Sequence, residues 1–125
     1  MSIYPALRYR DAHAAIDWLK EALGFEAVSV HEADGRVGHA ELTFGDGWIM
    51  LGSTGSGDER FDRGVGTSSL YLATDAVDAA YERAKAAGAT VTREIEDMDY
   101  GSREFSARDP EGNVWTFGTY DPFAS

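Results

Sequence analysis

The stretch DAHAAIDWLKEALG at residues 11–24 decides the fold, because its outline returns as DAVDAAYERAKAAG at residues 75–88. Each stretch starts with an aspartate, whose carboxylate can cap the first turn of a helix, and ends with a glycine, which readily takes the left-handed conformation that follows a helix. Between these ends, apolar residues recur at helical spacing. We therefore predict two helices that start 64 residues apart. The expected caps are Asp11 and Asp75, and the expected stops are Gly24 and Gly88.

Short strand patterns surround both predicted helices, with one strand before each helix and three after it. The expected strands are 3–9, 25–31, 38–44 and 48–51 around the first helix, and 68–73, 90–95, 102–107 and 113–120 around the second. Turn glycines repeat at nearly the same offset, since Gly38, Gly47 and Gly52 recur as Gly101, Gly112 and Gly118. Landmarks that recur in order at one offset indicate an internal duplication.

The duplication predicts an α+β fold, in which two βαβββ modules form a curved mixed sheet around a cleft. Module one spans residues 1–52, a glycine-rich linker or hinge spans 53–66, and module two spans 67–125. A chain of 125 residues has the length of one domain, so we expect both modules to share it. The helices would cover the outer face of the sheet and leave the inner face to line the cleft.

Charge and composition exclude several classes of partner. The chain has 11 basic and 22 acidic side chains, a net charge of −11, and no basic run, which opposes binding to nucleic acid or to an anionic membrane surface. It has no cysteine for a disulfide, a thiolate nucleophile or a zinc site. No apolar run approaches the roughly 20 residues of a membrane span, and the start of the chain lacks a secretion signal, so we expect a cytoplasmic protein.

Alternation along the strands assigns side chains to the core or to the cleft. The expected core residues are Ala40, Leu42, Phe44, Ile49, Leu51, Trp115 and Phe117. The expected cleft residues are His39, Glu41, Trp48, Met50 and Thr116. The repeat offset places Glu104 opposite Glu41. Tyr100 lies in a loop beside the cleft, where it would either cap a ligand or pack on a partner subunit.

His39 and Glu41 form the sharpest candidate for chemistry. They lie two residues apart on a predicted strand and therefore on one face. Three roles stay open: a general acid/base pair, two ligands of a displaced metal site, or a polar wall that makes ordinary hydrogen bonds. The role of Glu104 is open as well. If it faces Glu41, the two carboxylates would share a proton or attract a cation. If it lies beside Arg8, Arg103 or Arg108, it would only form an ion pair.

The paired modules occur together with YPALRYRD at residues 4–11, LGF at 23–25 and RDPEGN at 108–113. In this combination the chain resembles the vicinal oxygen chelate superfamily, which includes glyoxalase I, extradiol dioxygenases, fosfomycin-resistance enzymes and bleomycin-resistance proteins. The resemblance covers essentially the whole chain. Its most specific piece is GSREFSARDPEGN at residues 101–113, which is similar to the corresponding segment of bleomycin-resistance proteins.

In the metal-using members of this superfamily, four positions hold a divalent cation, one on the first strand and one on the last strand of each module. Histidine and glutamate supply the ligands there, because imidazole nitrogen and carboxylate oxygen suit such cations. The matching positions here are Tyr4, Met50, Ser69 and Thr116. None is a histidine or a carboxylate. The resemblance therefore implies that the metal site is lost, and we expect no cofactor.

What remains of the family pattern is a binding cleft. The resemblance implies that Tyr4, Ser69 and Tyr71 also lie at this cleft, where Tyr4, Trp48 and Tyr71 would suit a flat or cationic ligand. The resemblance to bleomycin-resistance proteins, which are metal-independent dimers, implies a homodimer that binds a small cationic or aromatic molecule. An alternative is a lyase or isomerase of the superfamily, acting on a small oxygenated substrate with His39 and Glu41 as acid and base. A third is a family member that acts only through interaction with other molecules. The sequence leaves open whether the protein is an enzyme.

Overall fold

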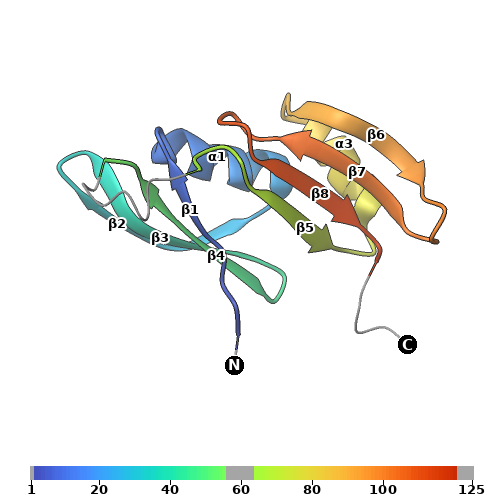
Figure 1. The fold of residues 1–125 in the computed structure, drawn as a ribbon, viewed down its shortest axis with the longest axis horizontal. Coiled ribbons are helices and arrows are strands. Elements are labelled where there is room, and N and C mark those ends of the chain that lie inside the picture. The colour runs from blue at the N-terminus through green and yellow to red at the C-terminus, as the bar shows by residue number, and fades with distance from the viewer. Residues whose placement is uncertain (1, 56–63, 121–125) are drawn as a thin grey trace.

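A computed structural model describes residues 2–55 and 64–120 of the chain, so residues 56–63 of the predicted linker lie outside the described part (Figure 1). The helices and strands follow one another in the predicted order. The elements are β1 (Ala6–Tyr9), α1 (Ala12–Leu23), β2 (Glu26–Ala33), β3 (Arg36–Phe44), β4 (Gly47–Ser53), β5 (Ser69–Ala73), α3 (Val77–Ala86), β6 (Thr90–Asp97), β7 (Arg103–Arg108) and β8 (Val114–Gly118).

The strands form two separate four-stranded sheets, in the orders β1-β4-β3-β2 and β5-β8-β7-β6. In each sheet the first pair is parallel and the other two pairs are antiparallel, so both sheets are mixed. The same register occurs twice, because Ala6 lies opposite Met50 in the first sheet and Tyr71 lies opposite Thr116 in the second. These two pairs are related by offsets of 65 and 66 residues. The predicted α+β fold of two βαβββ modules is confirmed.

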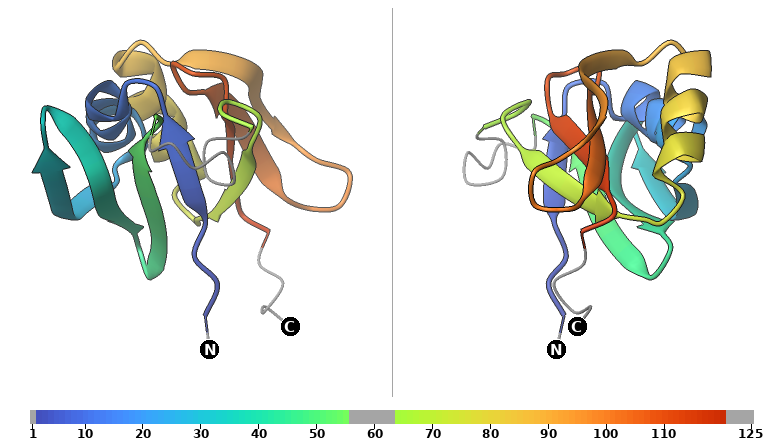
Figure 2. Two further views of the ribbon diagram at one scale, coloured as in Figure 1. Left: turned by 60° about the vertical axis from the view of Figure 1, so that its left-hand side comes forward. Right: turned by 90° about the vertical axis from the view of Figure 1, so that its right-hand side faces the viewer.

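The edge strands β1 and β5 lie toward the middle of the molecule, and β2 and β6 lie at its two ends (Figures 1 and 2). The two helices also contact each other, so the modules share one layer of helices. The predicted core positions lie between the helices and the sheets, where Ala40, Leu42, Trp115 and Phe117 are fully buried. Phe44 is only partly buried and packs at the margin of this core. In the described residues, neither helix is long and apolar enough to cross a membrane.

The predicted ends of the first helix are confirmed, whereas the predicted cap at the start of the second is wrong. Asp11 caps α1 by accepting a hydrogen bond from the Ala14 amide at 3.1 Å, and Gly24 follows with a φ of 81°. The N-cap of α3 is Ala76, which makes no side-chain cap. Asp75 is not the cap, because the helix starts two residues later and the Ala76 amide donates instead to the hydroxyl of Thr74. At its other end α3 stops at Ala86, and Gly88 follows with a φ of 79° and donates its amide to the Lys85 carbonyl at 3.0 Å, so the predicted glycine stop is confirmed.

A buried carboxylate at the turn between β7 and β8 joins the two modules. The Oδ2 atom of Asp109 accepts a hydrogen bond from the hydroxyl of Tyr9 on β1, at 2.6 Å. The same oxygen accepts from the side chains of Asn113, at 2.9 Å, and Trp115, at 3.1 Å. All four residues are at least 97% buried. Burial and the adjacent carboxylate raise the pKa of Tyr9 far above its usual value, so this hydroxyl stays protonated and remains a donor.

Candidate functional site

Four of the residues around the predicted cleft enclose a hollow on the free face of the first sheet. It has a volume of about 230 Å³ and is lined by Tyr4, Glu41, Trp48 and Met50. Met50 lies directly opposite Glu41 on the neighbouring strand, which explains why the two residues share this face. Tyr4 and Trp48 are exposed. This hollow therefore offers two aromatic rings, one thioether and one carboxylate.

The predicted pair of His39 and Glu41 is present at the side of this hollow. The Nε2 atom of His39 lies 3.2 Å from the Oε2 atom of Glu41. The ring of His39 also stacks on that of His31, with ring centroids 6.4 Å apart. Both members of the pair are well exposed, with 44% and 37% of their side-chain surfaces accessible. A general base is usually held by a third group that orients it, and in the described residues the His39 imidazole meets only Glu41 and His31.

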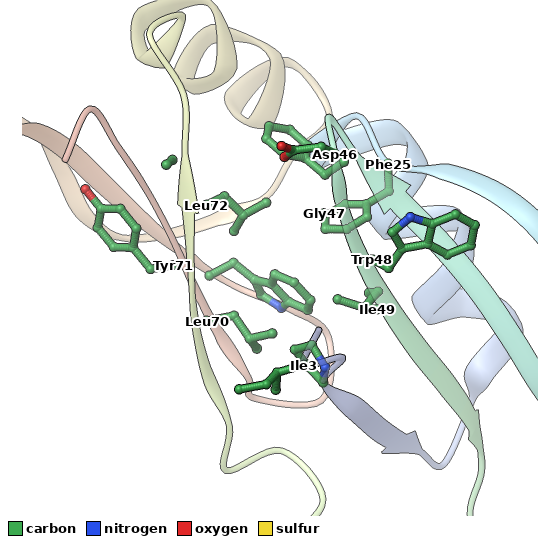
Figure 3. A pocket seen from close by; sticks show the side chains of 13 residues that line it. Ile3, Phe25, Asp46, Gly47, Trp48, Ile49, Leu70, Tyr71 and Leu72 are labelled. Carbon is green, nitrogen blue, oxygen red and sulfur yellow. The ribbon is translucent and has the colours of Figure 1, made fainter. Parts of the chain in front are cut away.

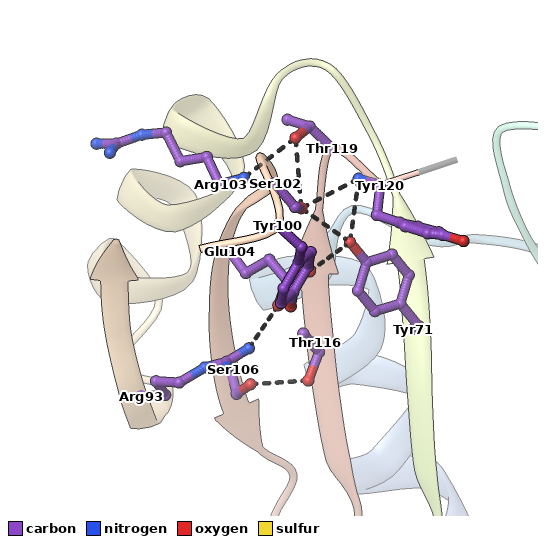
Figure 4. Close-up of polar contacts among 10 residues, drawn as sticks. All are labelled: Tyr71, Arg93, Tyr100, Ser102, Arg103, Glu104, Ser106, Thr116, Thr119 and Tyr120. Carbon is purple, nitrogen blue, oxygen red and sulfur yellow. Dashed lines mark hydrogen bonds and ion pairs between the residues drawn. The ribbon is translucent and has the colours of Figure 1, made fainter. Parts of the chain in front are cut away.

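A second hollow, on the free face of the second sheet, has a volume of about 390 Å³ and is lined by Tyr71, Tyr100, Tyr120 and Glu104 (Figure 4). The three tyrosine rings are all exposed, whereas the side chain of Glu104 is only 3% exposed. The rings of Tyr71 and Tyr120 meet edge to face, with centroids 6.5 Å apart. The hollow therefore has aromatic walls around one recessed carboxylate.

The Glu104 carboxylate is held by donors on both of its oxygens (Figure 4). Its Oε1 atom accepts from the hydroxyl of Tyr100 at 2.7 Å and from the guanidinium of Arg93 at 2.9 Å. Its Oε2 atom accepts from the hydroxyl of Tyr71 at 2.7 Å. Burial by itself would raise the pKa of Glu104, but the hydrogen bonds, led by that from Tyr100, outweigh burial and lower the pKa below its usual value. The carboxylate is therefore ionised at neutral pH.

The tyrosines around Glu104 are shifted in the opposite direction. Burial, together with the hydrogen bond to the carboxylate, raises the pKa of Tyr71. The hydrogen bond to Glu104 is the main reason that the pKa of Tyr100 is raised. A carboxylate that resists protonation and phenols that resist ionisation make poor proton-transfer groups at neutral pH. The cluster is instead a fixed negative charge surrounded by aromatic rings.

The local sequence explains how this cluster forms. Glu104 lies opposite Gly118 on β8, and Tyr71 lies opposite Thr116, two residues earlier on the same strand. A Cβ atom at Gly118 would overlap the hydroxyl of Tyr71 and would lie 2.7 Å from the Cγ atom of Glu104. The absence of a side chain at Gly118 therefore makes room for the tyrosine to reach the carboxylate. On the same face of the sheet, the hydroxyls of Ser106 and Thr116 form a hydrogen bond at 2.7 Å.

The four positions at which related proteins hold a metal do not fit a metal here. Tyr4 and Met50 line the first hollow, Thr116 is paired with Ser106, and Ser69 is exposed at the start of β5. Hydroxyls and a thioether are weak ligands for a hard or borderline divalent cation. Within residues 2–55 and 64–120, no three histidine, aspartate or glutamate side chains gather closely enough to hold an ion.

The structure does not bring Glu41 and Glu104 together, because the two hollows lie on different sheets. Between the sheets lies a cavity of about 300 Å³, which is lined mainly by core-facing side chains such as Ile49, Leu70 and Leu72. At this cavity the side chains of Trp48 and Tyr71 point away from each other (Figure 3). The free faces of the two sheets therefore do not form the two walls of one cleft within a single chain.

Three contributors to the second hollow were not predicted from the sequence: Arg93, Ser102 and Tyr120. Arg93, and not Arg8, Arg103 or Arg108, pairs with Glu104. Arg103 pairs instead with Asp78 and Asp97 at the surface. The hydroxyl of Ser102 accepts from the Tyr120 amide at 3.1 Å and lies 3.3 Å from that of Tyr71, so it braces the tyrosines. Strand alternation could have found Arg93 only if the β6–β7 register were regular, and it shifts on both sides of Arg93.

Comparisons with known proteins agree with this geometry. The family model of the Glyoxalase/Bleomycin resistance protein/Dioxygenase superfamily matches residues 3–117. An uncharacterised protein from Mycobacterium bovis is 32% identical over 126 aligned positions, which cover 94% of this chain and 82% of that protein. TioX from Micromonospora sp. ML1 has a similar crystal structure, with a TM-score of 0.78, 30% identity, and coverage of 94% of this chain and 98% of its own.

A more distant structure shares the fold. The bleomycin resistance determinant encoded on transposon Tn5 gives a TM-score of 0.71 at 20% identity, over 97% of this chain and 98% of its own. At that identity the likeness concerns the fold alone. The family model covers nearly the whole chain, and the structure has the duplicated module arrangement that its neighbours share. The chain belongs to the Glyoxalase/Bleomycin resistance protein/Dioxygenase superfamily.

Proposed function

We propose that this protein binds a small cationic molecule that carries an aromatic group, and that it does so without a metal ion. The observation that carries the proposal is the ionised Glu104 carboxylate, recessed among the rings of Tyr71, Tyr100 and Tyr120. A carboxylate attracts a cation, and tyrosine rings add cation–π and stacking contacts. The net charge of −11 favours the approach of a cation in addition.

The same proposal includes a homodimer whose two clefts each combine a first sheet from one copy with a second sheet from the other. Each hollow is walled by one sheet only, and the two hollows of a chain open on separate faces. The two hollows also expose large aromatic side chains, which are those of Tyr4, Trp48, Tyr71, Tyr100 and Tyr120. Such surface is commonly covered by a ligand or by a partner.

The proposal is one of binding and not of catalysis, and its support is chemical. The alternative lyase or isomerase would rely on His39 and Glu41, which are exposed side chains, and among the described residues the His39 imidazole meets only Glu41 and the ring of His31. The Glu104 cluster is more enclosed, but its pKa shifts keep its protons in place at neutral pH. Neither the His39–Glu41 pair nor the Glu104 cluster has the arrangement that proton transfer to a substrate requires.

Thermal-shift measurements on metal-stripped protein test the proposal. The ligands are a panel of cationic aromatic compounds, including metal-free bleomycin, each paired with a neutral compound of similar shape. A cation at about 100 times its Kd should stabilise the fold by about 2.7 kcal/mol, which is several degrees in Tm. The proposal is overturned if no cation stabilises the protein, or if stabilisation requires an added divalent metal. Sedimentation should give twice the chain mass of 13.6 kDa, and a monomer would remove the shared cleft.

A further inference from the structure

We propose that Arg93 is an internal competitor, whose guanidinium occupies the cation position beside Glu104 until an amidinium or guanidinium group of the ligand displaces it. This inference rests on the proposed function, and it adds the chemical class of the ligand group and the residue that gates it. The starting observation is that the recessed carboxylate already holds a guanidinium, with Arg93 Nη2 at 2.9 Å from Glu104 Oε1.

Arg93 pairs with the carboxylate but fits its surroundings poorly. Its Nε–H group is buried and has no hydrogen-bond partner in the described residues. A buried donor without an acceptor weakens the state that contains it. A ligand cation that satisfies all its donors would therefore compete well for the same oxygen.

The position of Arg93 allows its side chain to leave. The residue lies on β6, the edge strand of its sheet, and the pairing with β7 shifts register on both sides of it. Such irregularities re-aim side chains and leave the strand less constrained. The side chain of Arg93 is 37% exposed, whereas that of Glu104 is 3% exposed. Solvent can therefore receive the arginine, while the carboxylate stays in its pocket.

The surroundings favour a flat cation over an anion or a neutral group. When Arg93 leaves, the hollow keeps one negative charge and three tyrosine rings, and the hydroxyls of Tyr71 and Tyr100 already donate to the carboxylate. The Glu104 carboxylate then lacks only the hydrogen bond from the positively charged guanidinium of Arg93. A planar amidinium supplies that donor in the same geometry as the guanidinium and can stack on a ring.

The test compares Arg93→Met with Arg103→Met by calorimetric titration with benzamidinium at pH 7. Both substitutions remove one positive charge, but Arg103 pairs with Asp78 and Asp97 at the surface. If Arg93 occupies Glu104 in about nine molecules of ten, its removal tightens benzamidinium binding about tenfold relative to wild type. Arg103→Met should change binding less than about twofold, because the Arg103 side chain points away from the hollow and its charge, paired with two surface carboxylates, is screened by salt (Figure 4). Neutral benzamide should show no gain in either variant.

The inference is overturned if Arg93→Met binds benzamidinium no more tightly than Arg103→Met, or fails to bind it. Should Arg93→Met not fold, Arg93→Gln retains a neutral donor for Glu104 and must give the same direction of change. The two proposals can fail separately. If wild type binds the cationic panel without metal but Arg93→Met shows no gain, the internal competition is wrong and the proposed function stands. If only the Arg93 variants bind, whereas wild type and Arg103→Met do not, the inference about Arg93 stands and the wild-type function needs another ligand.

Discussion

Gly118 is the position at which one added methyl group should disturb the site most. In Gly118→Ala the new Cβ atom would overlap the hydroxyl of Tyr71 and would lie 2.7 Å from the Cγ atom of Glu104. The tyrosine has little freedom to yield, because its hydroxyl donates to Glu104 at 2.7 Å and accepts from the Tyr120 amide at 3.2 Å. The ring must therefore move and give up these contacts.

The size of the effect follows from the contacts that are lost. A hydrogen bond to a charged group contributes about 1.5–3 kcal/mol, and forcing a methyl group into packed space costs about 1–3 kcal/mol. The two costs overlap, because the clash is relieved by breaking the bond, and Tyr71 is partly exposed. We therefore expect Gly118→Ala to lower the free energy of unfolding by about 2 kcal/mol and to weaken cation binding about tenfold.

Urea unfolding and benzamidinium titration measure the two effects. The matched control is Gly38→Ala on β3, where a Cβ atom would find its nearest neighbour, the His31 carbonyl oxygen, at 3.8 Å in ordinary contact. This control should keep both its stability and its affinity. If Gly118→Ala is as stable and binds as tightly as Gly38→Ala, the packing of Tyr71 against Glu104 does not build the site.

Three further outcomes follow from other contacts. The pKa of Glu104 is lowered from 4.5, so the stability it contributes is complete above about pH 4.5 and is lost as the pH falls through the lower folded value. Unfolding free energies measured between about pH 5 and 3 should therefore fall less steeply in Glu104→Gln than in wild type, and equal slopes would contradict this. Tyr9→Phe removes one buried donor to Asp109 and should cost about 1–2 kcal/mol in urea unfolding, whereas an unchanged midpoint would refute the role of that bond. His39→Ala breaks an exposed ion pair and should change stability by less than about 1 kcal/mol, with no effect on cation affinity. A large loss of affinity would instead support a direct role of His39.

The fold could be predicted because local signals agreed with the duplication. The N-cap at Asp11 and the stop at Gly24 are present as predicted, and the alternation on β3, β4 and β8 assigned the core side chains correctly. The start of the second helix was less predictable, since Thr74, and not Asp75, accepts a hydrogen bond from a backbone amide there, that of Ala76. Near a helix start, neighbouring polar side chains compete for the same amides, and sequence pattern alone does not choose between them.

The site could be predicted residue by residue but not as an arrangement. Tyr71, Tyr100 and Glu104 were each expected in or beside the cleft, and they meet around the second hollow. The separation of Glu41 from Glu104 depends on how one sheet packs beside the other, and no strand pattern encodes that angle. Arg93 was missed because two register shifts in β6 break the alternation on which the prediction rested.

The most direct measurement of metal-free cation binding is a calorimetric titration of EDTA-treated protein with benzamidinium, repeated after addition of zinc or nickel and repeated in Glu104→Gln. Our account predicts one binding site per chain without metal, an affinity that the metals leave unchanged, and a loss of about tenfold or more when the Glu104 charge is removed. Binding that appears only with a divalent metal, or that is equally strong in Glu104→Gln, would contradict it.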